Sequence, residues 1–145
     1  MPGLEACLLF KETRRIASFT PGDRTTLEMF VARPAALLVA KLHKVGERIR
    51  DQARRAQAKD AFDVLRFLQA PGGEGLADDL LIGRSDALCW PSVRQGVEYL
   101  RALFSTPAAA GCRLLRDGYA GVGATLAAQV QVLASELSNR LTRTP

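Results

Sequence analysis

Apolar residues return with a helical period along most of the chain after residue 33. The first such stretch repeats them at steps of four, three and four: Leu38, Leu42, Val45 and Ile49. This spacing places the side chains on one face of an α-helix, because a helical turn takes about 3.6 residues. We expect this helix to begin near Pro34, a residue favoured in the first helical turn, and to run to about Arg50.

The same pattern predicts further helices at about 59–70, 74–82, 91–105, 108–117 and 121–141. Proline and glycine separate them, at Pro71-Gly72-Gly73, from Gly83 to Ser85, and at Thr106-Pro107. The helix at 59–70 has a core face formed by Ala61, Val64, Leu65 and Leu68. The last helix carries a narrow seam for packing on another helix, formed by Val122, Leu126, Val130, Leu133, Leu137 and Leu141.

The N-terminal part of the chain has the pattern of short strands. Residues 4–10 and 14–19 are predicted strands, with Lys11 to Thr13 as a turn between them, and residues 25–31 form a third strand of partly buried type. The segment Thr20-Pro21-Gly22-Asp23 is a strong turn signal, because proline presets φ and glycine accepts a positive φ.

These elements together predict an α+β fold that is mainly helical. A small N-terminal antiparallel sheet in residues 1–31 precedes a helical bundle in residues 33–145. The chain has 145 residues, of which 48% are hydrophobic and 24% charged, as is ordinary for a soluble globular protein. At this length we expect a single domain, residues 1–145, with one core.

The net charge of +5 is unevenly distributed. Residues 41–59 contain only Glu47 and Asp51 as acids, against seven cations: Lys41, Lys44, Arg48, Arg50, Arg54, Arg55 and Lys59. A local field of that sign favours polyanionic partners such as RNA, DNA or nucleoside triphosphates. The other interpretation is a solvated basic linker, and residues 52–58 either extend the preceding helix or form such a linker.

The cysteines and the hydropathy pattern predict a cytoplasmic protein. Cys7, Cys89 and Cys112 are far apart and have no C-x-x-C spacing, which suits a reducing compartment, and with a single histidine they do not suggest a metal site. The N-terminus lacks the pattern of a signal peptide, and the longest apolar stretch is too short to cross a bilayer, so we expect no membrane association.

Two groups of charges are the candidate site. Lys41, Lys44 and Arg48 share one helix face, and Asp60 and Asp63 lie three residues apart on the next helix. A row of cations beside paired acids suits a phosphate or nucleotide ligand. Ordinary solvated helix faces are the alternative.

A structural role for the two acids is also open. Asp60 is a candidate N-cap, whereas Asp63 either pairs with Lys59 at i,i+4 or reaches across to Lys41 or Arg48 and fixes the two helices in register. We expect Lys41 to lie near the core, because it follows the apolar run ALLVA.

Four other residues receive structural interpretations. His43 has no Ser, Cys or Asp partner at motif spacing, so we expect it to be packed or hydrogen-bonded. Asp78 and Asp79 are adjacent, so they point to different faces of a helix and cannot chelate an ion as i,i+3 acids do. Both are assigned to solvent. Trp90 is expected to fill a junction between helices.

Two runs of sequence carry a resemblance. The run V-A-R-P-A-A-L-L-V-A-K-L-H-K, then Arg48, then K-D-A-F-D-V-L-R-F-L resembles the C-terminal half of a nucleotidyltransferase-like family related to AbiEii-type toxins of type IV toxin–antitoxin systems. The positions that match the family pattern are Ala40, Lys41, Leu42, His43, Arg48, Lys59, Asp60 and Asp63. The resemblance implies that intact relatives transfer a nucleotide from an NTP to RNA or protein, with magnesium.

The chain departs from that family at the catalytic motif. Family members carry a Gly-Ser or Gly-Gly turn followed by D-x-D on a strand, and these acids hold the magnesium. No D-x-D or E-x-D occurs in this sequence. We therefore expect the C-terminal portion of such a protein, inactive alone. It is a truncated gene product, a degenerate copy, or one piece of a split protein that a partner protein completes. A non-catalytic RNA- or protein-binding helical module is the alternative.

The site prediction follows from both lines of reasoning. No catalytic residue is assigned, and neither metal ligands nor a cofactor are expected in this chain. The resemblance implies magnesium and NTP for intact relatives. The residues predicted to bind nucleotide or to lock the scaffold are Lys41, Lys44, Arg48, Lys59, Asp60 and Asp63.

Overall fold

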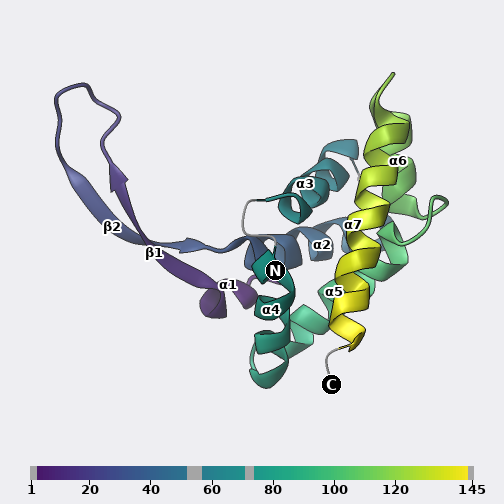
Figure 1. Ribbon diagram of the computed structural model, residues 1–145, viewed down its shortest axis with the longest axis horizontal. Coiled ribbons are helices and arrows are strands. Elements are labelled where there is room, and N and C mark those ends of the chain that lie inside the picture. The colour runs from purple at the N-terminus through teal and green to yellow at the C-terminus, as the bar shows by residue number, and fades with distance from the viewer. Residues whose placement is uncertain (1–2, 52–56, 71–73, 144–145) are drawn as a thin grey trace.

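The structure is a computed structural model that describes residues 3–51, 57–70 and 74–143. Its elements follow in the order α1 (Ala6–Leu9), β1 (Lys11–Ala17), β2 (Thr26–Ala32), α2 (Pro34–Asp51), α3 (Ala58–Leu68), α4 (Glu74–Ile82), the 3₁₀ turn η2 (Gly83–Ser85), α5 (Trp90–Phe104), α6 (Ala110–Gly118) and α7 (Gly123–Arg143). Figure 1 shows a two-stranded hairpin followed by a bundle of helices. The predicted fold class, mainly helical with a small N-terminal antiparallel sheet, is confirmed.

Helix α2 lies in the middle of the helical body. It packs against α3 on one side and α5 on the other, and α7 runs across α3, α5 and α6. The apolar face predicted for α2 is buried, with Leu38, Leu42 and Val45 all at most 2% exposed. These side chains pack in one core with Leu65 of α3 and Leu100 of α5. Burial of this periodic face, more than helix propensity, stabilises the helix.

A glycine sets the distance between α2 and α5. A Cβ built on Gly46 would lie 2.4 Å from Cδ1 of Tyr99, which is closer than two carbon atoms approach in proteins. The absence of a side chain at Gly46 lets the Tyr99 ring approach the α2 backbone closely. The same ring meets His43 edge-on, at 5.6 Å between centroids.

The seam of α7 is partly as predicted. Val130, Leu137 and Leu141 are buried, and Leu126 and Leu133 are half-buried. Val122 precedes the helix and is 54% exposed, so the prediction that it belongs to the seam is wrong. Small residues complete the buried face instead: Ala127, Ala134 and Ser138. The spacing of large apolar residues alone does not reveal that these small residues belong to the buried face.

Strands β1 and β2 form an antiparallel hairpin, in which Lys11 lies opposite Ala32 and Ala17 lies opposite Thr26. The predicted turn is confirmed, since Asp23 N donates to Thr20 O at 3.1 Å and Gly22 has φ of +83°. The hairpin extends away from the helical body, with its tip far from the bundle (Figure 1).

The strand predicted at 4–10 is wrong, and so is the turn predicted at 11–13. Phe10 N donates to Ala6 O at 2.8 Å, which closes a helical turn in place of a strand. Ala6 and Phe10 are both buried and lie four residues apart, a helical spacing. The residues predicted as a turn open β1. The strand predicted at 25–31 exists, but it is mostly exposed, not partly buried.

Most predicted helix bounds hold within a few residues. The prediction for 52–58 concerns mainly residues 52–56, which lie outside the described residues, as do Pro71-Gly72-Gly73. Trp90 begins α5, and its ring is half-buried against the core at the junction predicted for it. Within the described part of the chain, no helix has the length and hydropathy needed to cross a membrane.

Candidate functional site

The cations of α2 and the acids of α3 meet in one cluster, which we call the α2–α3 charge cluster: Lys41, Lys44, Arg48, Asp60 and Asp63. Lys44 Nζ lies 2.7 Å from Asp60 Oδ1, and an Arg48 guanidinium nitrogen donates to the other Asp60 oxygen. Lys41 Nζ donates to Asp63 Oδ2 at 2.8 Å and lies 3.6 Å from Asp60 Oδ1. The spacing of the cations along α2 therefore matches the spacing of the acids on α3.

Asp60 is the centre of this cluster. Its side chain is 4% exposed, and both of its oxygens accept from cations. Burial favours the neutral acid, but the hydrogen bond from Lys44 and the charges of Lys44 and Arg48 outweigh it, so the pKa of Asp60 lies below its ordinary value. Asp60 is thus an ionised carboxylate within the helix interface.

The expected N-cap role of Asp60 is wrong. Helix α3 begins at Ala58, its N-cap residue is Gln57, and Asp60 lies in the first turn. There its charge is favourable for the helix dipole while its side chain points to α2. The expectation that Lys41 lies near the core and meets a carboxylate is confirmed, since its side chain is 18% exposed.

Lys59 lies apart from the cluster. Its side chain is exposed, and among the described residues it forms no ion pair, so the i,i+4 pair with Asp63 is not made. The acids of α3 instead meet the three predicted α2 cations. Five of the six predicted site residues therefore come together, and of their contacts only the cross-helix pair of Asp63 with Lys41 was among the predicted alternatives.

His43 is packed and hydrogen-bonded, as expected. Its ring is 4% exposed, and Nε2 lies 2.8 Å from the carbonyl oxygen of Ser92. Because a carbonyl only accepts, Nε2 is the protonated nitrogen. The Ser92 hydroxyl donates elsewhere, to Glu5 at 2.8 Å. The histidine thus ties α2 to the start of α5.

The assignment of Asp79 to solvent is wrong. Its side chain is 6% exposed and lies 2.9 Å from an Arg33 guanidinium nitrogen, at the point where the hairpin joins α2. Burial raises the pKa of Asp79, against the opposing effect of Arg33. Asp78 is exposed, as expected. The two neighbours differ because one faces the helix interface, and their adjacency in sequence does not reveal which.

The thiols and acids offer little other chemistry. Burial raises the pKa of Cys89 to about 11, which makes its thiol a poor nucleophile at neutral pH. Cys7, Cys89 and Cys112 are free. Within the described ranges, no three His, Cys, Asp or Glu side chains gather as a metal site would require.

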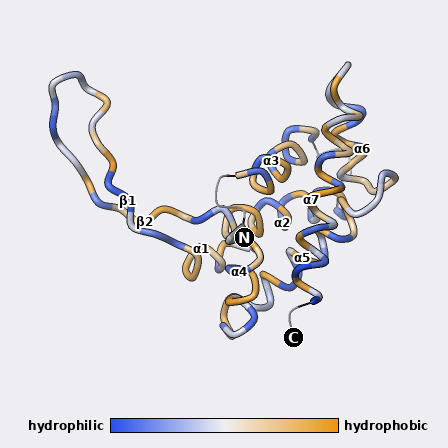
Figure 2. The backbone as a smooth tube through the Cα atoms, in the orientation of Figure 1, coloured by the Kyte–Doolittle hydropathy of each residue, from blue (hydrophilic) through white to orange (hydrophobic). Residues whose placement is uncertain are grey.

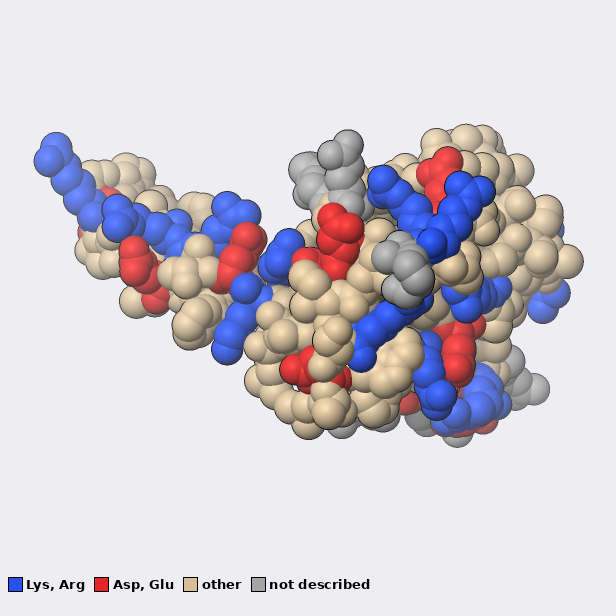
Figure 3. All heavy atoms as spheres, turned by 60° about the horizontal axis from the view of Figure 1, so that its bottom comes forward, with Lys and Arg blue, Asp and Glu red and all other residues tan. Residues whose placement is uncertain are grey.

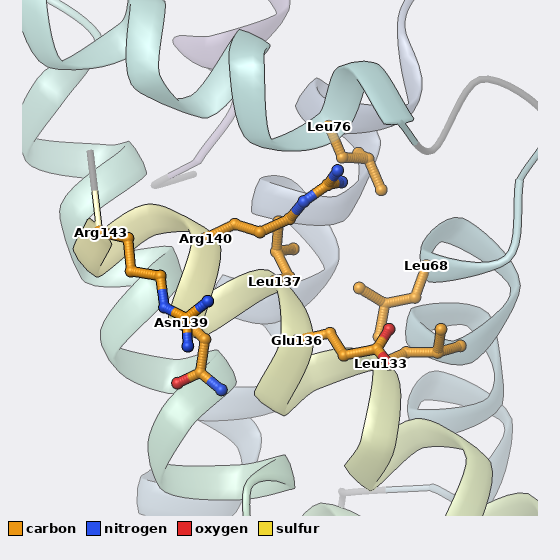
Figure 4. A pocket seen from close by; sticks show the side chains of 8 residues that line it. All are labelled: Leu68, Leu76, Leu133, Glu136, Leu137, Asn139, Arg140 and Arg143. Atoms are coloured by element: carbon orange, nitrogen blue, oxygen red, sulfur yellow. The ribbon is translucent and has the colours of Figure 1, made fainter.

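A separate depression of about 510 Å³ lies on α7 where this helix meets α3 and α4. Figure 4 shows its lining residues: Leu68, Leu76, Leu133, Glu136, Leu137, Asn139, Arg140 and Arg143. The Arg140 side chain extends toward Leu76 across an apolar floor. The depression shares no residue with the α2–α3 charge cluster, so the two are distinct features.

No protein-family model, curated protein or solved structure matches this chain.

Proposed function

We propose that this chain is the C-terminal, non-catalytic portion of a nucleotidyltransferase-like protein of the cytoplasm, in which the α2–α3 charge cluster is a structural lock. One observation supports the lock most directly: each of the three α2 cations is already paired with Asp60 or Asp63. The positions that carry the family resemblance thus have a role within the fold that needs no nucleotide.

A nucleotide would have to compete with those carboxylates. To replace Asp60 as the partner of Lys44 and Arg48, a phosphate would have to displace a carboxylate whose side chain is 4% exposed. An acid left in that position without its cations would carry the penalty of an unpaired buried charge. In this proposal the acids that hold magnesium and the NTP in intact relatives belong to a partner protein.

The proposal predicts that the isolated chain neither transfers nor tightly binds nucleotides. The test is incubation with each of the four labelled NTPs, magnesium and total RNA, together with a filter-binding titration of the same NTPs. We expect no labelled product and no saturable binding below about 1 mM, a weak-binding threshold of about 4 kcal/mol. Labelled product that scales with the purified chain would contradict the proposal.

A variant at Asp63 tests whether this carboxylate competes with a phosphate group for Lys41. Asp63→Asn removes one charge from the cluster and leaves Lys41 with a neutral partner, so we expect it to bind phosphate groups better than the wild type does. Equal or weaker NTP binding by this variant would show that Asp63 does not compete for the cation. If total RNA is retained with steep salt dependence, the RNA-binding alternative is favoured over the lock.

A further inference from the structure

One face of the hairpin, which we call its apolar face, carries four apolar side chains, with Glu12 and Arg14 beside them on β1. Directly opposite residues of an antiparallel pair share a face, so one face carries the pairs Glu12–Val31, Arg14–Met29 and Ile16–Leu27. Leu27, Met29 and Ile16 are 63%, 44% and 39% exposed. Leu27 and Met29 alternate with polar residues along β2, and Ile16 lies opposite Leu27 on β1. The hairpin that carries them projects from the helical body (Figure 2).

On the opposite face, the charged side chains contact other residues of the hairpin. Lys11 Nζ lies 4.7 Å from the centre of the Phe30 ring, and Arg15 pairs with Glu28 at 3.2 Å. Figure 3 shows acids interleaved with the cations along this arm of the molecule. On this face the charged side chains of Lys11, Arg15 and Glu28 therefore have partners within the hairpin.

The two edges of the hairpin differ in their protection. Strands at a sheet edge expose unpaired backbone groups, and natural proteins guard such edges with charged side chains or proline. The β1 edge is guarded by Lys11, Arg14 and Arg15. The β2 edge has Glu28 as its single charged residue and no proline. A further strand can therefore add at β2 more readily than at β1.

We propose that β2 pairs edge to edge with β2 of a second copy of this chain, antiparallel and centred on Met29. The strand is its own complement in this register, because Leu27 of one copy lies opposite Val31 of the other and both lie on the apolar face. The two Glu28 side chains lie opposite Phe30, not opposite each other. The result is a four-stranded sheet in the order β1–β2–β2–β1.

The shape of the molecule permits this pairing. Met29 is the middle residue of β2, and the hairpin extends well clear of the helices (Figure 1). A twofold axis at Met29 puts the two helical bodies at opposite ends of the new sheet. A two-stranded ribbon is only marginally stable in water, whereas four strands whose two central members share an apolar face are considerably more stable. The dimer thus stabilises an otherwise exposed arm.

A disulfide reports the register directly. Opposite residues of antiparallel strands have Cα atoms about 4.5–5.5 Å apart, within the range of a disulfide. In a Cys7→Ser background, Met29→Cys should form a covalent dimer on mild oxidation. Arg14→Cys is the matched control, because Arg14 lies opposite Met29 on the same face but on the outer strand. Equal cross-linking of the two variants, or none in Met29→Cys, would overturn the proposal.

Sedimentation velocity over a concentration series provides the second measurement. We expect the full chain to show a monomer–dimer equilibrium that Leu27→Lys weakens by at least about tenfold, or 1.4 kcal/mol. Ile16→Lys places the same charge directly across the hairpin, on β1, and should change the dimer Kd by less than about threefold. A monomer at all concentrations, or equal weakening by both variants, would contradict pairing through the β2 edge.

Discussion

Asp60 and Asp79 are both buried carboxylates, but their surroundings have opposite effects. Asp60 accepts from Lys44 and Arg48, which lower its pKa despite burial, whereas burial outweighs Arg33 at Asp79 and raises its pKa. A shifted pKa is a difference in proton binding between the folded and unfolded chain, so it makes stability depend on pH. The lowered pKa of Asp60 stabilises the fold above the ordinary value of 3.8, and this contribution is lost as pH falls through the folded-state pKa. The raised pKa of Asp79 has the opposite effect on stability. It destabilises the fold at neutral pH, and this destabilisation is lost as pH falls through the raised pKa.

The two asparagine variants should therefore differ at pH 7. We expect Asp60→Asn to lower the free energy of unfolding by about 2 kcal/mol, less than the 3–5 kcal/mol of a fully buried pair because Lys44 and Arg48 remain part-exposed. Asp79→Asn should leave stability unchanged or slightly higher, and that advantage should disappear as pH falls through the raised pKa. Urea unfolding at pH 7 and in steps down to below pH 3.8, where the Asp60 contribution is lost, measures both. Equal destabilisation by the two variants would contradict the opposite signs.

At the scale of the elements, long periodic segments could be predicted from the sequence and short ones could not. The 18-residue α2 repeats its apolar face often enough to identify a helix. The run LEACLLF is too short for its period to be decided, and the packing of Ala6 and Phe10 makes it helical. The sequence left Asp63 open between Lys59 on its own helix and Lys41 or Arg48 on α2, and the structure gives the pair with Lys41. Asp60 was interpreted as a cap because it lies near the start of its helix.

The close approach of α2 and α5 yields a prediction at this scale. Gly46→Ala should lower the free energy of unfolding by about 1–3 kcal/mol, because the new methyl group would overlap the Tyr99 ring. Gly75→Ala in α4 is the control, since its Cβ would meet only Arg33 at an ordinary 3.8 Å. That control should be neutral or stabilising by about 0.4–1 kcal/mol. Thermal or urea unfolding that ranks the two in the opposite order would show that the helices are not in this contact.

The whole molecule divides into a packed helical body and a projecting arm. Local turn chemistry at Thr20–Asp23 was enough to predict the hairpin, but not its direction. That direction depends on how β2 continues into α2 and on the ion pair between Arg33 and the buried Asp79. The body is held by its apolar core and by the α2–α3 charge cluster. We propose above all that this cluster locks α2 to α3 within the fold.

A double-mutant cycle tests the lock most directly. Urea unfolding of Lys44→Met, Asp60→Asn and the double variant gives the coupling energy of the pair, which we predict to be about 1 kcal/mol or more. The exposed pair Arg94–Glu98, 3.8 Å apart, is the control and should give about 0.3–0.5 kcal/mol with Arg94→Met and Glu98→Gln. A Lys44–Asp60 coupling no larger than the control would contradict the lock and leave the α2 cations open to an external anion.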